Sequence, residues 1–214
     1  MPRSKRYRQL LRNLSELRRY LLPAHFDPTG SYSDRVLTRT LGYRVLVHAE
    51  IEAFLEDRAW NIALNALRAW KDRQEVTRTA MSLIAFCGLL QDSPPKSLEA
   101  DQPNEVKQWA EKLDLDRKLK RAANAFHHVV QRNHGIREEN LLGLLLPVGV
   151  PADQIDPFWV ATLDSFGERR GEAAHSSVVG YRTRQPPDPE GEYREVQGIA
   201  GWLKTVDAHL SALE

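Results

Sequence analysis

The sequence predicts an all-α protein that folds as a single helical bundle of 214 residues. Apolar residues recur at steps of three and four along most of the chain, which is the period of a helix buried on one face. No segment alternates apolar and polar residues over more than a few positions, so strands are not expected. No repeat period is evident, and long helices without a repeat are typical of a bundle.

A basic amphipathic helix is expected within residues 1–23, ending near Pro23. Five leucines form its apolar stripe, and its other face carries seven basic residues against one acid, Glu16; the basic residues are Arg3, Lys5, Arg6, Arg8, Arg12, Arg18 and Arg19. Three roles are open for this face. It is a solvated surface above a packed stripe, it contacts RNA phosphates through Arg6, Arg8 and Arg12, or it binds a membrane surface.

Ser33 is the predicted N-cap of the longest helix, which runs from Asp34 to about Trp70. A third and largely buried helix is expected over residues 75–90. The single cysteine, Cys87, lies in the apolar run of this third helix, so we expect an inert core residue and no internal disulfide. The next segment is rich in proline, serine and acidic residues and predicts a loop.

Two helices are expected between residues 104 and 149. The first runs from Asn104 to about Gln131, with Gly135 following as its C-terminal cap. The second is short, and it stops at Pro147 because proline cannot continue a helix.

Two more helices complete the chain. Asp156 and Pro157 predict the start of a helix over residues 157–175, as N-cap and first helical residue. Residues 184–193 contain three prolines and predict a loop. A C-terminal helix follows over residues 193–214, with apolar positions at steps of three and four.

Composition narrows the functional classes. The net charge is only +1, so the overall charge does not indicate a nucleic-acid partner. The N-terminus lacks the apolar stretch of a signal peptide, and the longest apolar runs are far shorter than the roughly 20 residues that span a bilayer. We therefore expect a cytoplasmic protein without a membrane partner. The absence of HExxH, GxxxxGK[ST] and GxGxxG motifs favours no metal and no cofactor.

The segment "GERRGEAAHSS" at residues 167–177 places Arg170 five residues before His175 at a predicted helix end. Arginine binds a phosphate with a planar fork of donors, and histidine transfers protons near neutral pH. RNA carries its own nucleophile in the 2′-hydroxyl, so such a pair suffices for cleavage without a metal. The spacing alone is weak, because Arg19–His25 and Arg121–His127 match it too. A capped helix end is the structural alternative.

Three segments, the first of which contains this pair, place it in context: "WVATLDSFGERRGEAAH", "HAEIEAFLEDRAWNIAL" and "NHGIREENLLGLLLPVGVP". In their order and spacing they resemble HEPN domains, in the branch named for its association with ribosomal L-PSP-type proteins. The resemblance covers roughly residues 34–176, which form the expected HEPN-like up-and-down core. The basic helix at 1–23 and the C-terminal helix at 193–214 are additions to it, within one domain over residues 1–214.

The resemblance implies a homodimer that brings two Arg–His pairs together, and a metal-independent endoribonuclease of a toxin–antitoxin or antiphage system. Arg170 and His175 match the catalytic motif, and Arg169 would assist them. RNA is then the substrate, and an antitoxin or defence protein is a possible partner. The chain departs from many active members in carrying Gly171 directly after the motif arginine. The alternatives are a catalytically silent HEPN module that binds RNA, a nucleotide or a protein, and a purely structural dimerisation bundle.

Two acids on the long helix, Glu52 and Asp57, complete the candidate site. A carboxylate beside the Arg–His pair orients its partner in the way that the acid of a catalytic triad does. A structural ion pair with an arginine is the other reading for these two residues.

Overall fold

The computed structural model of the chain describes residues 3–88, 114–175, 180 and 186–214. Every element in these residues is helical, which confirms the all-α prediction. The elements are α1 (Lys5–Leu21), α2 (Asp34–Arg73), α3 (Arg78–Phe86), α5 (Leu115–Gln131), α6 (Glu138–Leu145), a short 3₁₀ turn η1 (Ala152–Gln154), α7 (Pro157–His175) and α9 (Pro189–Ser211).

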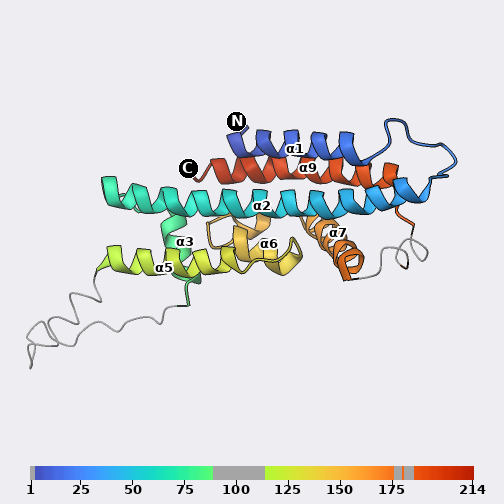
Figure 1. The fold of residues 1–214 in the computed structure, drawn as a ribbon. Helices are drawn as coiled ribbons and strands as arrows, with labels where there is room; N and C mark the ends of the chain where they lie inside the picture. Colours follow the sequence, from blue (N-terminus) through green and yellow to red (C-terminus); the bar gives the residue numbers. More distant parts are fainter. Residues whose placement is uncertain (1–2, 89–113, 176–179, 181–185) are drawn as a thin grey trace, which may run out of the picture.

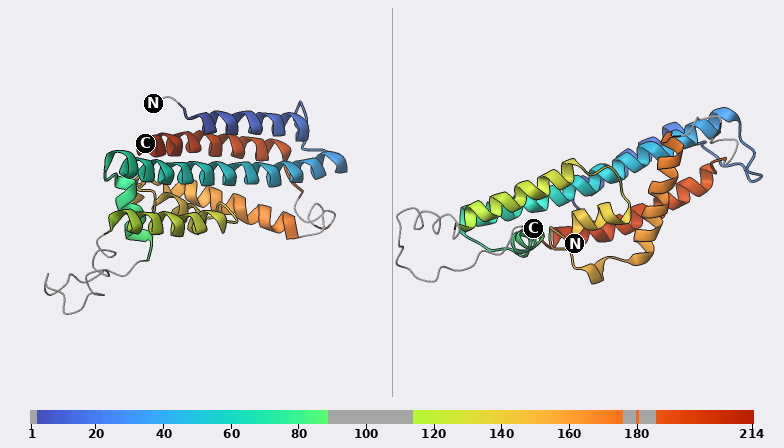
Figure 2. Two further views of the ribbon diagram at one scale, coloured as in Figure 1. Left: turned by 60° about the vertical axis from the view of Figure 1, so that its left-hand side comes forward. Right: turned by 90° about the horizontal axis from the view of Figure 1, so that it is seen from below.

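The 40-residue helix α2 is the axis of the molecule. Helices α1 and α9 lie along one side of it, and α3, α5, α6 and α7 lie along the other, as the views in Figures 1 and 2 agree. Two hydrogen bonds join α1 to α9: the Ser4 N–H donates to Asp207 Oδ2 at 2.9 Å, and the Tyr7 hydroxyl donates to the Ala200 carbonyl at 2.7 Å. The long helix thus separates the chain into two layers of helices.

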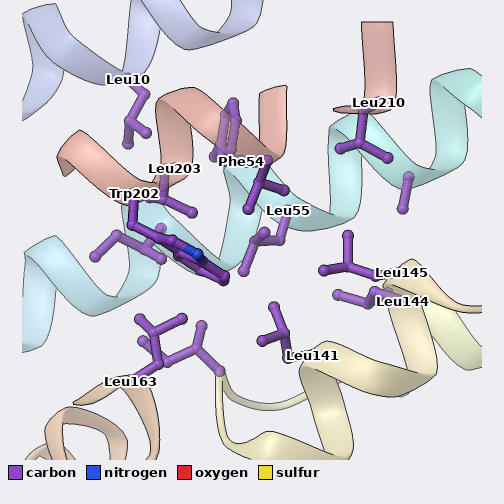
Figure 3. Close-up of a cluster of buried hydrophobic side chains, with 14 of the residues drawn as sticks. Leu10, Phe54, Leu55, Leu141, Leu144, Leu145, Leu163, Trp202, Leu203 and Leu210 are labelled. Atoms are coloured by element: carbon purple, nitrogen blue, oxygen red, sulfur yellow. The ribbon is translucent and has the colours of Figure 1, made fainter. Parts of the chain in front are cut away.

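The core lies where α1, α2, α6, α7 and α9 converge. Figure 3 shows leucines from all five helices meeting around Phe54, Leu55 and Trp202. Leu10, Leu55, Leu141, Leu163 and Leu203 have no exposed surface. Burial of each such side chain contributes about 1.5–3 kcal/mol to folding. Because these residues must face the core, their spacing in the sequence determines which face of each helix points inward.

One predicted cap and the bounds of two predicted helices were wrong. α5 ends at Gln131 as predicted, but it does not use Gly135 as its cap: Arg132 and Asn133 close it by donating backbone hydrogen bonds to His128 and Val130. Because the Arg132 backbone keeps φ at −98°, the end needs no left-handed residue. The start predicted for this helix, residues 104–113, lies outside the described residues.

The C-terminal helix begins at Pro189, inside the predicted loop. The Asp188 side chain accepts hydrogen bonds from the N–H groups of Glu190 and Gly191, at 3.0 Å each, and Pro189 takes the first helical position. A proline-rich segment thus contains a helix start.

The third helix is shorter and less buried than predicted. α3 spans nine residues, and its Met81 and Phe86 side chains are 61% and 58% exposed. Only one face of α3 packs against the rest of the protein. Cys87 follows it, partly buried against the core as expected.

Within the described residues, no helix combines the length and the apolar character that crossing a bilayer requires.

Candidate functional site

Helix α7 carries Arg170 to the surface of α2. The helix begins as predicted, with the Asp156 side chain accepting a hydrogen bond from the Phe158 N–H at 2.9 Å. Phe166 is fully buried, and Arg170 lies one turn further along on the same face. The helix continues to His175, so the whole Arg170–His175 spacing is helical. The side chain of His175 itself lies outside the described part of the structure.

The surface of α2 that faces Arg170 is polar. His48 and Glu52 lie one turn apart, with 3.6 Å between His48 Nδ1 and Glu52 Oε2. The His48 ring stacks on Phe166, with 6.4 Å between centroids and 16° between planes. A Cβ on Gly167 would lie 3.3 Å from Cγ of Arg137, which is a tight contact, and 3.8 Å from Nε2 of His48, which is an ordinary one. The glycine in α7 therefore makes room for the Arg137 side chain beside this region.

The turn after α5 adds amide groups to the same region. The Asn133 side chain donates to Glu56 Oε1 at 2.7 Å and accepts from the Asn140 side chain at 3.0 Å. His134 follows and is exposed. We call this set the Arg170 cluster; it comprises His48, Glu52, Glu56, Asn133, His134 and Arg170.

Burial and mutual charge shift the pKa values in the cluster. Burial, followed by the positive charge of Arg170, lowers the pKa of His48 to about 4. Burial and the nearby Glu56 raise the pKa of Glu52, whereas Arg170 and His134 act in the opposite direction. Burial also raises the pKa of Glu56, against the hydrogen bond from Asn133. His48 is therefore neutral at pH 7 and cannot act there as a cation.

Arg170 keeps its hydrogen-bonding capacity within the described residues. Its Nε atom is buried and has no hydrogen-bond partner there, and no carboxylate in that part of the chain lies within ion-pairing distance of the guanidinium. His48 Nδ1 is buried as well and has no hydrogen-bond partner in the described residues, since Glu52 Oε2 is 3.6 Å away. Buried polar groups are nearly always paired, so two such atoms at one place indicate a region that is not optimised for stability. A free guanidinium in such a region is suited to binding an anion.

The other predicted site residues lie apart from the cluster. Arg169 donates to both carboxylate oxygens of Glu195 in α9, at 2.6 and 2.5 Å. Asp57 is 57% exposed and pairs with Arg6 of α1 at 2.7 Å. Of the predicted residues, the structure thus brings Glu52, and neither Asp57 nor Arg169, to Arg170.

The basic residues of α1 differ in their surroundings. Arg6 is tied to Asp57, and Arg12 donates to the side chain of Gln9, its neighbour on the same helix. Arg8 is exposed and has no side-chain partner among the described residues. The three predicted RNA contacts are therefore not equivalent.

Sequence reasoning missed His48, Asn133 and His134. A usable signal existed for His48, which shares one helical face with the buried Ile51 and Leu55 and is followed one turn later by Glu52. A histidine on a buried face beside an acid indicates a polar site within the core. Asn133 and His134 lie in a turn, where no periodicity indicates direction.

Among the residues that the structure describes, no group of three or more His, Cys, Asp or Glu side chains is arranged to hold a metal ion. Comparisons of the chain with protein-family models, with curated proteins and with solved structures found no match. The sequence motifs alone therefore carry the HEPN resemblance, and the function has to be argued from the chemistry of the cluster.

Proposed function

We propose that this chain is a metal-independent endoribonuclease of the HEPN type, acting on RNA as the effector of a toxin–antitoxin or antiphage system. The observation that supports it is the position of Arg170. It reaches a polar cluster at the end of α7 with no carboxylate partner among the described residues, and five residues separate it from His175 on the same helix.

In the proposed reaction, the 2′-oxygen of RNA forms a bond to the neighbouring phosphorus, and the bond from phosphorus to the 5′-oxygen breaks. A base removes the 2′-proton, and an acid protonates the departing 5′-oxygen. Arg170 binds the phosphate and stabilises the charge of the crowded intermediate. The products end in a 2′,3′-cyclic phosphate and a 5′-hydroxyl.

His175 is one of the two proton-transfer groups in this proposal. A two-fold homodimer supplies the second, because such an interface brings the same residue from both copies to one axis. His134 is a second source within one protomer, since it is exposed and lies beside Asn133 in the cluster. Replacement of His134 by alanine distinguishes the two: a homodimer that uses two copies of His175 retains its activity in this variant.

Glu52 and His48 are positioning residues in this scheme. Glu52 acts electrostatically on Arg170, whereas His48, neutral at pH 7, stacks on Phe166, one turn before Arg170 on α7. They hold the guanidinium at the wall of α2 without neutralising it.

The test is an RNA cleavage assay in EDTA with the parent protein and its Arg170→Ala and His175→Ala variants. Each variant is expected to lose at least about 100-fold in rate, the range of general acid–base and phosphate-binding groups. Arg121→Ala is the matched control, because Arg121 is exposed and forms the decoy pair with His127. Cleavage that needs Mg²⁺, or that survives loss of His175, contradicts the proposal.

A catalytically silent RNA-binding module is the second candidate, and Gly171 is the observation that favours it. Among the described residues, no atom outside the nearby backbone of α7 lies within 4 Å of the place where a Cβ on Gly171 would be, so their packing does not require glycine here. Packing therefore does not explain why the polar residue that many active HEPN nucleases carry at this position is missing. Its loss is expected of a module that binds RNA without cleaving it. RNA binding without cleavage by the parent, with cleavage appearing in Gly171→Asn, supports this candidate.

A further inference from the structure

Helix α2 extends beyond the first turn of α1 and the last turn of α9. A pocket of about 660 Å³ lies where α1 begins and α9 ends. The first turn of α1 forms one wall, and the C-terminal segment contributes Ser211 at the end of α9 and the carboxylate of Glu214. Arg58, Asn61 and Asn65 contribute from α2. Steps of three and four residues place these three α2 side chains on one helical face. Three helices thus contribute side chains to one recess.

Two of the arginines at this pocket are already neutralised. Arg6 pairs with Asp57 at 2.7 Å. Arg58 lies 2.9 Å from Asp207 and 2.7 Å from Glu214, with side chains 5% and 3% exposed for Arg58 and Asp207. The acids around the pocket in the described residues are therefore bound to cations that stabilise the fold.

Three other cations at the pocket have no such partner. Arg3, Lys5 and Arg8 line it, and among the described residues no carboxylate lies within ion-pairing distance of them. Asn61 is exposed, and no hydrogen bond of its side chain occurs in that part of the chain. The Asn65 amide oxygen accepts from Arg68 at 3.1 Å, which leaves its NH₂ group for another acceptor. The pocket thus presents an excess of donors.

The backbone reinforces this charge. The first turn of α1 contains no acidic residue, and the Ser4 side chain caps only the Tyr7 N–H. The positive end of the helix dipole faces the region of the three cations, and it is compensated in part by the Asp207 carboxylate, which accepts a hydrogen bond from the Ser4 N–H at 2.9 Å. Arg6 adds a buried Nη1 that has no hydrogen-bond partner in the described residues.

We propose that this pocket binds a phosphate group, carried either by an RNA backbone or by a small free phosphate. Arg3, Lys5 and Arg8 neutralise the anion, and the amides of Asn61 and Asn65 donate to its oxygens from the floor. Arginine, lysine and side-chain amides are the groups that proteins use to bind phosphate oxygens. The sequence suggests that the basic face of α1 contacts RNA phosphates. The pocket restricts phosphate binding to the start of α1 and excludes Arg12.

The pocket is separate from the Arg170 cluster. Asn61 follows Glu52 by nine residues of α2, which is two and a half turns and about 13 Å along the axis. The two side chains therefore leave the helix on opposite sides. Phosphate binding here does not depend on the proposed cleavage, and each can fail without the other.

The test uses two probes, inorganic pyrophosphate in calorimetry and a 12-nucleotide single-stranded RNA in fluorescence anisotropy. All proteins carry Arg170→Ala, so that the RNA stays intact and the result is independent of catalysis. The pocket variant adds Arg3→Gln, Lys5→Gln and Arg8→Gln. The matched control adds Arg12→Gln, Arg19→Gln and Arg35→Gln, three exposed arginines outside the pocket with the same change in charge.

The pocket variant is expected to bind at least one probe tenfold or more weakly, whereas the control stays within about twofold. For a backbone phosphate, only RNA binding weakens, and its log–log salt dependence flattens by about 0.7 per lost contact. For a small free phosphate, only pyrophosphate binding weakens. Asn61→Asp, which places a carboxylate on the pocket floor at an exposed position, should have the same effect without removing a cation. Equal affinities of the pocket and control variants for both probes, or no binding of either probe by the Arg170→Ala protein, would overturn the proposal.

Discussion

The two sides of α2 treat buried charge in opposite ways. On the side of α9, Arg44 is 4% exposed, and its Nε donates to both carboxylate oxygens of Glu192, which is 6% exposed. On the side of α7, the buried Nε of Arg170 and Nδ1 of His48 have no hydrogen-bond partner among the described residues, and Glu52 Oε2 lies 3.6 Å from the His48 Nδ1 atom. One side pairs an arginine of α2 with a carboxylate of α9, whereas the other side brings an arginine of α7 to α2 without a carboxylate at ion-pairing distance in the described residues.

This difference indicates which arginine stabilises the fold and which is available to bind another molecule. A buried arginine with its carboxylate fixes the position of one helix against another, and it is costly to break because the remaining charge stays buried. An arginine left without a carboxylate adds little to the stability of the fold. Unsatisfied buried groups are therefore expected where a protein binds something else. Three predictions test this comparison.

Arg44→Met should have the largest effect on folding. It leaves the Glu192 carboxylate buried without its cation, which costs about 3–5 kcal/mol in the free energy of unfolding. Urea unfolding followed by circular dichroism measures the loss. The double variant Arg44→Met/Glu192→Leu should recover most of it, because an apolar pair of similar volume replaces a buried ion pair at little cost. A double variant as unstable as the single one contradicts this account of the α9 side.

His48→Phe should change the dependence of stability on pH. The pKa of His48 is lowered from 6.5 to about 4 in the folded protein, so the unfolded chain binds more protons between these values. The contribution of His48 therefore destabilises the fold as pH falls through this window, by about 3 kcal/mol in total. The raised pKa values of Glu52 and Glu56 act in the opposite direction.

The measurement is the difference in urea-unfolding free energy between the parent and His48→Phe at pH 7 and at pH 4. The free energy of unfolding of the variant minus that of the parent should be larger at pH 4 than at pH 7. His128→Gln is the control, because His128 is exposed on α5. If the free energy of unfolding of the parent and of His48→Phe depends on pH in the same way, His48 is not held neutral by the fold.

Arg170→Met should have the smallest effect on folding. It removes no hydrogen bond or ion pair within the described residues and retains an apolar stem, so the free energy of unfolding should change by less than about 1 kcal/mol. Cleavage of RNA should fall sharply in the same variant. A loss of stability close to that of Arg44→Met would show that Arg170 holds the bundle together, and the comparison between the two sides of α2 would fail.

The helices were largely predictable, because each has a periodic apolar face and most have a sequence signal at the N-terminus. The same N-terminal signal occurs twice. Asp156–Pro157 predicts the start of α7 correctly, whereas Asp188–Pro189 begins α9 in the same way although the sequence around it predicts a loop. The surrounding prolines concealed a local rule that holds at both places.

The site was predictable only in part. Arg170 stands out through its spacing to His175 and through the family resemblance, and Glu52 through the motif on the long helix. His48 and Arg170 are 122 positions apart, and their approach depends on how α7 crosses α2, which no local pattern contains. The pairing of Arg169 with Glu195 and of Arg6 with Asp57 likewise follows from helix packing. The sequence therefore indicates which residues have reactive or charged side chains. The packing of the helices determines which of these side chains are held in ion pairs.

Helix α2 contacts every other α-helix that the structure describes, as its central place in Figure 1 suggests. No layer can separate from the bundle without exposing one face of this helix. Its central amides, around Ile51 and Leu55, should therefore exchange with deuterium only when the whole molecule unfolds. The amides of α3, which has one exposed face, should exchange sooner through local opening. Both proposed sites include side chains of α2, so the α2 residues of the Arg170 cluster and of the phosphate pocket should keep their positions until the fold opens.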